Sequence, residues 1–176
     1  MNKAIITSTK KMKNWWKKVI GKNYDPPEMT TGDFEKDNKV VLISIHPRHV
    51  ENILNGTKKV EYRRKFGNHI KRMFIYSTSP VQKIVARADV EEIIEGDRYE
   101  VWHKTKEIGG ITRAEYMEYF KYSRAKAIVL KNVIEFDSVT LEEMHINRPP
   151  QSYQFMETGW ILQLVARMTQ GSRRRI

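Results

Sequence analysis

The residues best suited to chemistry lie in one stretch of the chain, 55-NGTKKVEYRRKF-66. After Gly56 it carries five basic side chains and a single carboxylate, Glu61. Two interpretations are open. Charged side chains on an edge strand hinder edge-to-edge aggregation, and a strand of that kind needs no ligand. Alternatively, lysine, glutamate and arginine side chains face one another and form a polar site.

Strand geometry restricts the second interpretation. Side chains alternate across a strand, so Glu61 and Arg63 share one face while Lys58 and Tyr62 share the other. A buried Glu61 needs a basic or hydrogen-bonding partner, because an unpaired buried carboxylate is very costly. Lys58 can therefore join Glu61 only if the backbone bulges or loops at Lys58, directly after Gly56.

Other arrangements of reactive residues give weaker signals. His46 and His49 are spaced to share a metal ion, but no third ligand is in register. We therefore expect no metal site and no cofactor. A serine triad cannot be assembled from the spacing, and the sequence contains no glycine-rich phosphate loop.

Composition limits the class of protein. A chain of 176 residues is expected to form one domain with an appendage. The absence of cysteine excludes disulfides, thiolate zinc sites and a cysteine nucleophile. No apolar run has the length of a membrane span, and the lysine-rich start lacks the apolar region of a signal peptide. We therefore expect a cytoplasmic protein.

The net charge of +11 is distributed unevenly. Residues 1–22 carry seven lysines and residues 166–176 carry four arginines, and neither segment has an acid. These ends hold 11 of the 32 basic residues, so 21 remain to balance the 21 acids of the middle. Within that neutral middle, 58–72 has seven basic residues against Glu61 alone. A charge gradient of this kind suits a polyanion on one side of the domain, although a solvated surface gives the same totals.

Hydrophobic periodicity divides the chain into an N-terminal segment and a body. Residues 10–20 place two tryptophans on one face of a basic amphipathic helix, and 23–38 is rich in proline, glycine and acid, as in a linker. A β-branched run at 39–45 predicts a core strand, and Pro47 starts a helix that Gly56 ends. Further strands are expected at 59–64, 71–77, 83–94 and 126–136.

A second helix is expected over 113–122, because Thr112 and Glu115 have the spacing of a capping box. The apolar segment 160–168 is ambiguous between helix and strand. Many short strands without regular alternation of strand and helix indicate an α+β fold with a small, curled or barrel-like sheet and two or three flanking helices.

The stretch also resembles a known family. Gly56, Lys58, Glu61 and Arg63 reproduce the G-x-K-x-x-E-x-R motif of ASCH domains, which are PUA-like β-barrels associated with RNA. The flanking segments 43-ISIHP-47, 53-ILNG-56, 74-FIYSTSPVQKIVARADV-90 and 148-RPPQSYQFM-156 resemble the family as well, so the similarity covers about 40–156. We therefore expect three parts: a basic helix and linker over 1–38, an ASCH domain over 39–168, and a basic tail over 169–176.

The resemblance implies a cleft in which Lys58, Glu61 and Arg63 face a ligand, and it supplies the bend at Lys58. Relatives include RNA-binding domains, a ribonuclease, and amidohydrolases that remove the acyl group from acetylated cytidine. If the chain is an enzyme, the resemblance assigns Lys58, Glu61 and Asp89 to catalysis. The amidohydrolases have a hydroxyl residue at the Glu61 position, and this departure counts against that activity. His46 stands where relatives often have lysine.

Within such a cleft, Lys58 would contact phosphate or act as a base if desolvation lowered its pKa. Glu61 would accept hydrogen bonds from the amino group of a base, and Arg63 would hold Glu61 or bind phosphate. Tyr62 and Tyr76 are possible stacking platforms, although a tyrosine on a strand is commonly part of the core.

The sequence therefore predicts a domain that binds RNA, another single-stranded nucleic acid or a nucleotide-like small molecule, as a monomer. The candidate ligand-binding residues are Lys58, Glu61, Arg63, His46, Tyr62 and Ser152, and the candidate contacts to a nucleic-acid backbone are Arg64, Lys65, Lys71 and Arg72. The alternatives are a hydrolase that acts on an acylated nucleoside or on RNA, and a protein-interaction module that uses the tryptophan helix.

Overall fold

The computed structural model describes residues 40–171, which lie in one compact unit of the chain, Asn38–Ile176. The predicted tryptophan helix, the linker and the end of the arginine tail lie outside the described residues. The described elements in chain order are β1 (Val40–Ile45), α2 (Pro47–Leu54), β2 (Val60–Arg63), β3 (Arg72–Ser77), β4 (Lys83–Gly96), α3 (Arg98–Thr105), α4 (Arg113–Tyr119), β5 (Ala125–Thr140), β6 (Tyr153–Phe155) and α5 (Thr158–Gly171).

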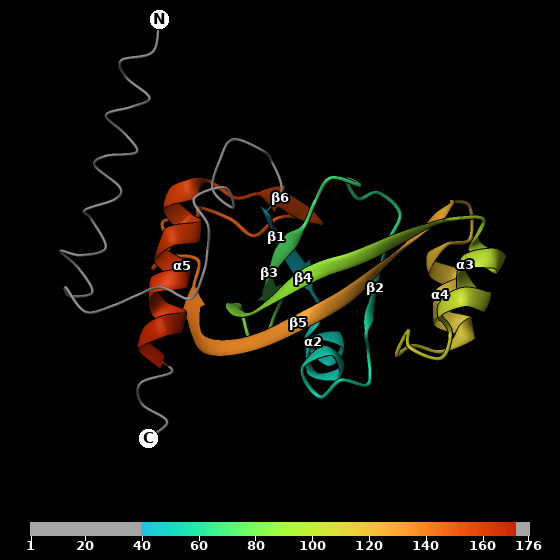
Figure 1. Cartoon of the computed structure of the whole chain (residues 1–176), viewed down its shortest axis with the longest axis horizontal. Helices are drawn as coiled ribbons and strands as arrows, with labels where there is room; N and C mark the ends of the chain where they lie inside the picture. The colour runs from blue at the N-terminus through green and yellow to red at the C-terminus, as the bar shows by residue number, and fades with distance from the viewer. Residues whose placement is uncertain (1–39, 172–176) are drawn as a thin grey trace, which may run out of the picture. The chain divides into compact units, whose positions relative to one another are not determined.

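The described strands form one six-stranded sheet in the order β2-β5-β4-β3-β1-β6. β1 and β3 run parallel, and the other pairs are antiparallel. Register shifts interrupt the pairing of β4 with β5 at three places, and bulges of this kind bend a strand and increase its twist. The two long strands accordingly sweep across the molecule in Figure 1, and the sheet curls into a half-barrel. The expected α+β fold with a curled sheet is confirmed.

Two clusters of buried side chains support the sheet. In the first, Val50 and Ile53 of α2 pack on residues of β1, β3, β4 and β5. In the second, Tyr62 of β2 packs against Trp102 of α3 and against Tyr116 and Phe120 in and after α4. The motif strand β2 therefore lies between α2 and the pair α3 and α4, as Figure 1 shows.

The predicted strands and the helices at Pro47 and Thr112 are confirmed. Thr112 and Glu115 form the expected reciprocal capping box. The ambiguous segment 160–168 is helical and belongs to α5. The sequence prediction missed α3, so the described residues contain four helices where two or three were expected. None of these helices is both long and apolar enough to span a membrane.

Candidate functional site

Lys58, Glu61 and Arg63 converge in the structure, as the family resemblance predicted. Lys58 precedes β2, which begins at Val60, and lies in the turn after Gly56, whose φ of +79° suits glycine. The backbone N–H of Lys58 donates to the Asn52 carbonyl of α2 at 2.8 Å. This turn moves Lys58 out of strand alternation, and its Nζ lies 3.8 Å from Glu61 Oε2.

All three charged side chains of the motif are buried. Lys58 is 2% exposed, Glu61 6% and Arg63 9%. The interpretation of Glu61 as a solvated charge on an edge strand is therefore wrong. Burial of three charges is tolerated only where they pair with one another and with further hydrogen-bonding groups.

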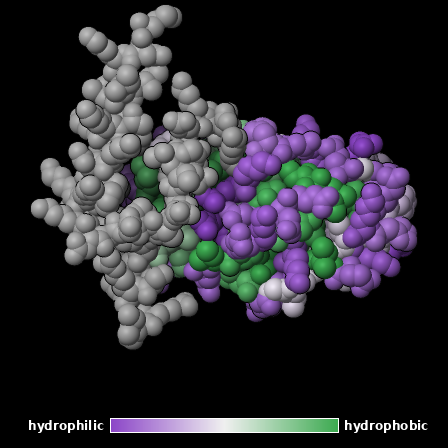
Figure 2. All heavy atoms as spheres, viewed as in Figure 1, coloured by the Kyte–Doolittle hydropathy of each residue, from purple (hydrophilic) through white to green (hydrophobic). Residues whose placement is uncertain are grey.

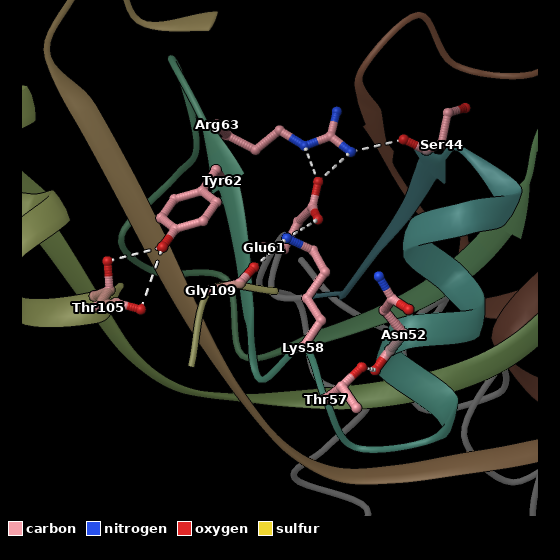
Figure 3. A network of polar contacts seen from close by, with 9 residues as sticks. All are labelled: Ser44, Asn52, Thr57, Lys58, Glu61, Tyr62, Arg63, Thr105 and Gly109. Atoms are coloured by element: carbon pink, nitrogen blue, oxygen red, sulfur yellow. Dashed lines mark hydrogen bonds and ion pairs between the residues drawn. The ribbon is translucent and has the colours of Figure 1, made fainter. Parts of the chain in front are cut away.

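Glu61 lies between the two cations (Figure 3). Arg63 Nε donates to Glu61 Oε1 at 3.0 Å, and Arg63 Nη2 lies 3.0 Å from the same oxygen. The two residues are two apart on β2 and therefore share a face. One carboxylate thus serves two cations, and the three side chains together carry a surplus of one positive charge when Lys58 is protonated.

Arg63 also links the motif to two other segments. Its Nη2 donates to the Ser44 carbonyl of β1 at 2.6 Å, and its Nη1 donates to Ser152 Oγ at 3.2 Å. Ser44 Oγ in turn donates to the Pro150 carbonyl at 2.6 Å. The predicted site residue Ser152 therefore lies beside the motif, and the proline–proline–glutamine–serine segment is held against β1.

Lys58 is enclosed by the loop between α3 and α4. Its Nζ donates to the Gly109 carbonyl at 3.0 Å and lies 4.9 Å from the centre of the Tyr62 ring. Burial lowers the pKa of Lys58, and the charges of Arg63 and Arg48 lower it further, while Glu61 raises it. The site therefore favours a lysine that gives up its proton more readily than a solvated one.

The glycine pair in this loop is a part of the candidate site that the sequence did not reveal. A Cβ on Gly110 would lie 2.5 Å from Lys58 Cβ, and Gly110 has a φ of +62°. A Cβ on Gly109 would collide with the Tyr62 hydroxyl. The Gly-Gly dipeptide is a turn signal, but its contact with Lys58 spans about fifty residues and no local pattern marks it.

A groove of about 440 Å³ opens next to Lys58, between α2 and the start of α4. Part of the wall of this groove is formed by residues around Lys58. Gly110 lies against Lys58, the Asn52 carbonyl accepts from Lys58 N, and Thr57 Oγ1 donates to the same carbonyl. Arg48 Nη2 donates to Glu115 Oε1 across the groove at 2.6 Å. Hydrogen bonds from Thr112 and Arg48 lower the pKa of Glu115 to about 2, so this carboxylate remains charged.

The two histidines lie at the start of α2. His46 is exposed and caps the helix, with its Nδ1 accepting from Arg48 N at 3.3 Å. His49 Nδ1 is buried and has no hydrogen-bond partner among the described residues. Burial lowers the pKa of His49, as does the charge of Lys58, while Glu61 raises it. Residues 40–171 contain no group of three acids or histidines placed to hold a metal ion.

The two tyrosines predicted as stacking platforms are buried. Tyr62 is buried, packs edge-on against Tyr116, and shares a hydrogen bond with Thr105 Oγ1 at 2.9 Å. The structure thus places its ring in the core and leaves no open face for stacking. Tyr76 is buried as well.

Asp89 is engaged at the other end of β1 and β3. It accepts from Arg72 Nε at 2.7 Å and from Asn132 Nδ2 at 3.1 Å. Arg72 pairs in register with Val40, whereas Ser44 holds Arg63, and four residues of strand span about 13 Å. The structure therefore does not bring Asp89 to Lys58, and Arg72 is neutralised by an ion pair.

The remaining predicted backbone contacts are on the surface. Arg64, Lys65 and Lys71 are exposed. Arg64 donates through Nε and Nη2 to the Tyr119 carbonyl, at 3.0 and 2.6 Å.

The curled six-stranded sheet is that of a PUA-like domain of the ASCH type. The sequence profile of the ASCH domain matches residues 43–140, which is more than half of the chain, and the chain belongs to this family.

An ASCH domain-containing ribonuclease from Zymomonas mobilis subsp. mobilis is 28% identical over 141 residues, covering 76% of this chain and 95% of that protein. The crystal structure of ASCH from Zymomonas mobilis superposes with a TM-score of 0.68 at 28% identity, covering 74% of this chain and 96% of that one. The large ribosomal subunit protein uL22 of Ureaplasma parvum is 24% identical over 127 residues, but this chain covers only 41% of its length.

Proposed function

We propose that this chain binds single-stranded RNA and cleaves it at the Lys58–Glu61–Arg63 site. The observation that carries the proposal is the buried cluster of two cations around one carboxylate, beside an open groove. A phosphate group would neutralise the surplus positive charge of this cluster. The similarity to an ASCH domain-containing ribonuclease along nearly its whole length supports the same substrate class.

The chemistry of the site suits attack by the ribose 2′-hydroxyl. A lysine with a lowered pKa can accept the 2′-hydroxyl proton in its neutral form. The 2′-oxygen then bonds to the adjacent phosphorus, the bond to the 5′-oxygen breaks, and the leaving oxygen takes a proton from solvent. The products are a 2′,3′-cyclic phosphate and a 5′-hydroxyl. Arg63, together with Lys58 once it has accepted the proton, stabilises the negative charge that develops on the phosphate.

Access to Lys58 requires movement of its cover. Lys58 is almost completely buried, and the backbone at Gly109 and Gly110 lies against it. This segment belongs to the loop between α3 and α4 and forms one wall of the groove. In our proposal, RNA enters the groove and the glycine loop moves away from Lys58, which exposes Nζ to the ribose.

The amidohydrolase alternative receives less support from the geometry. It requires an acid near Lys58 from a later strand, but Asp89 is paired with Arg72 at the other end of the sheet. It also requires a hydroxyl residue at the position of Glu61, and this carboxylate is already shared by Lys58 and Arg63.

The test is cleavage of an end-labelled single-stranded RNA by the wild-type chain and by Lys58→Met. The matched control is Lys65→Met, an exposed lysine seven residues further along the chain. We expect cyclic-phosphate products from the wild type and from Lys65→Met, no cleavage by Lys58→Met, and no cleavage of DNA of the same sequence, which has no 2′-hydroxyl. Undiminished cleavage by Lys58→Met would refute the proposed role of the motif. RNA binding without cleavage by the wild type would reduce the function to binding.

A further inference from the structure

A second groove, of about 350 Å³, lies where α3 begins and the turn after α4 leads into β5. Arg98, Tyr99, Lys121, Tyr122, Ser123 and Arg124 are among its lining residues. The end of the molecule formed by α3 and α4 is predominantly hydrophilic in Figure 2. We refer to Tyr99, Tyr119 and Tyr122, together with Arg64, Arg98, Lys121 and Arg124, as the tyrosine–arginine surface.

The tyrosines of this surface are exposed, and each has a cation over its ring. Tyr122 is 91% exposed, and Tyr99 and Tyr119 are also among the exposed large side chains. The distance from cation to ring centre is 4.7 Å for Arg64 and Tyr119, 4.8 Å for Arg98 and Tyr99, and 5.5 Å for Lys121 and Tyr122. Proteins that bind single-stranded nucleic acids stack the bases on aromatic rings and contact the phosphates with neighbouring cations.

Two arginines of this surface, Arg64 and Arg98, are held in position by uncharged oxygen atoms. Arg98 donates to the Lys121 carbonyl at 2.8 Å and to the Tyr99 hydroxyl at 2.8 Å, and Arg64 donates twice to the Tyr119 carbonyl. Elsewhere in the described residues Arg48, Arg72 and Arg167 form ion pairs with carboxylates. These oxygen partners fix both guanidinium groups while leaving them their charge.

Acidic groups offset this charge only in part. Asp97 lines the groove and caps α3, accepting from Tyr99 N at 2.8 Å. Glu118 lies 4.0 Å from Lys121 in an exposed pair, which contributes little. Glu95 interacts with Arg124 as well, but it is paired with Lys126 at 2.8 Å. The surface remains positive because its four cations, Arg64, Arg98, Lys121 and Arg124, exceed these three carboxylates.

One hydroxyl beside the groove has no hydrogen-bond partner within residues 40–171. Ser123 Oγ is inaccessible to solvent and has no hydrogen-bond partner in the part of the chain that the structure describes. Ser123 is one of the lining residues of the groove. A buried polar atom without a partner costs free energy, and a ligand would provide the missing hydrogen bond only after a movement of this turn that exposes the Oγ.

Two consecutive residues connect this surface to the motif. Arg63 points to Glu61 and Ser44, whereas Arg64 reaches Tyr119, because successive side chains of a strand face opposite ways. β2 is at the edge of the sheet. A flexible single-stranded RNA that passes over this edge of the sheet can contact both faces of β2, whereas a rigid duplex cannot.

We propose that the tyrosine–arginine surface binds single-stranded RNA outside the cleavage site, with one base stacked on Tyr122 and phosphates against Arg98 and Arg124. The inference rests on the proposed function for its ligand class, RNA, and adds a second binding site to it. The surface then holds the part of the strand that extends beyond the motif and keeps the substrate in place during cleavage.

The test uses a fluorescein-labelled 2′-O-methyl oligouridine, which has no free 2′-hydroxyl and is bound without being cut. Its affinity is measured by fluorescence anisotropy at low salt for the full chain. Tyr122→Leu is expected to weaken binding about five-fold or more, the lower end of what stacking on one aromatic ring contributes. Tyr122→Phe keeps the ring and is expected to bind as the wild type does.

Arg124→Met is expected to reduce the dependence of log Kd on log salt by about 0.7, as for one phosphate contact to a single strand. The matched control is Arg113→Met, because Arg113 is exposed at the start of α4, and it is expected to leave the slope unchanged. Tyr122 is almost fully exposed, so its substitution is not expected to disturb folding.

Equal affinity of wild type and Tyr122→Leu, equal slopes for Arg124→Met and Arg113→Met, or no binding of the probe by the wild type would overturn the inference. The two proposals fail separately. Loss of cleavage in Lys58→Met with unchanged probe binding in Tyr122→Leu refutes only the second site. Weaker probe binding in Tyr122→Leu with undiminished cleavage by Lys58→Met refutes only the catalytic role of the motif.

Discussion

The substitution Glu61→Gln tests whether one carboxylate holds the motif together. Glutamine has the shape of glutamate but no charge, and Glu61 is 6% exposed. Its oxygens lie 3.0 Å from Arg63 Nε and 3.8 Å from Lys58 Nζ. The glutamine oxygen can keep the hydrogen bond from Arg63. Lys58 then faces either the amide NH2 group or an uncharged oxygen in place of a carboxylate. Both cations then remain buried without a counter-charge.

The magnitude follows from these contacts. Removing one partner of a buried ion pair costs about 3–5 kcal/mol, and the retained hydrogen bond recovers about 1 kcal/mol. We therefore expect Glu61→Gln to lower the free energy of unfolding by about 2–4 kcal/mol. Loss of the Lys58 proton limits the cost, because burial already lowers the pKa of that amine. At about 3 °C per kcal/mol for a domain of this size, Tm falls by about 6–12 °C.

Urea and thermal unfolding at neutral pH measure the effect. The control is Glu91→Gln, since the Glu91 side chain is 54% exposed and 4.0 Å from Lys131. Its substitution is expected to change stability by no more than about 0.5 kcal/mol. The double variant Lys58→Met with Glu61→Gln should be more stable than the sum of the single changes predicts, because it removes both charges. If Glu61→Gln matched Glu91→Gln, the buried charges would not depend on Glu61.

Three further outcomes follow from the same geometry. Gly110→Ala is expected to cost about 1–3 kcal/mol of stability, because alanine is strained at positive φ and its Cβ meets Lys58. The control is Gly159→Ala, whose added Cβ would meet no neighbouring side chain within 4 Å, and it should be neutral or stabilising in the same urea titration. Arg48→Met removes a charge that lowers the pKa of Lys58, so that pKa rises and the cleavage rate should increase at a higher pH than in the wild type. A pH–rate profile that moves to lower pH would contradict the assignment of Lys58 as the base. A chain that begins at Asn38 should unfold cooperatively, and a molten or insoluble product would show that the segment before Asn38, with its predicted tryptophan helix, belongs to the core.

Local sequence patterns predicted most of the fold. The β-branched run at 39–45, the alternation in 83–94 and the capping box at Thr112 and Glu115 each depend on neighbours in the sequence, and the structure confirms the corresponding elements. α3 was missed although Asp97 is a good N-cap. Only Val101, Trp102 and Thr105 of that helix are buried, so its apolar pattern is too weak to detect.

The site was predictable only as far as the motif reaches. The family resemblance placed Lys58 beside Glu61 against strand alternation, and the structure agrees. The cover at Gly109 depends on a contact 51 residues away, which no periodicity reveals. Tyr62 was a candidate for stacking because sequence does not show that α3 and α4 enclose its ring.

The stability of the fold alone does not explain why these three charged side chains are buried. A hydrophobic cluster of the same volume is often as stable as a buried ion pair or more so, so stability does not require Lys58, Glu61 and Arg63. Two cations around one carboxylate leave either a positive charge or a neutral amine. In the proposed function, the positive charge would bind a phosphate and the neutral amine would accept a proton from a ribose hydroxyl, so an RNA substrate would engage both protonation states of Lys58. Pairing each cation with its own acid, as Arg72 pairs with Asp89, would remove both capacities.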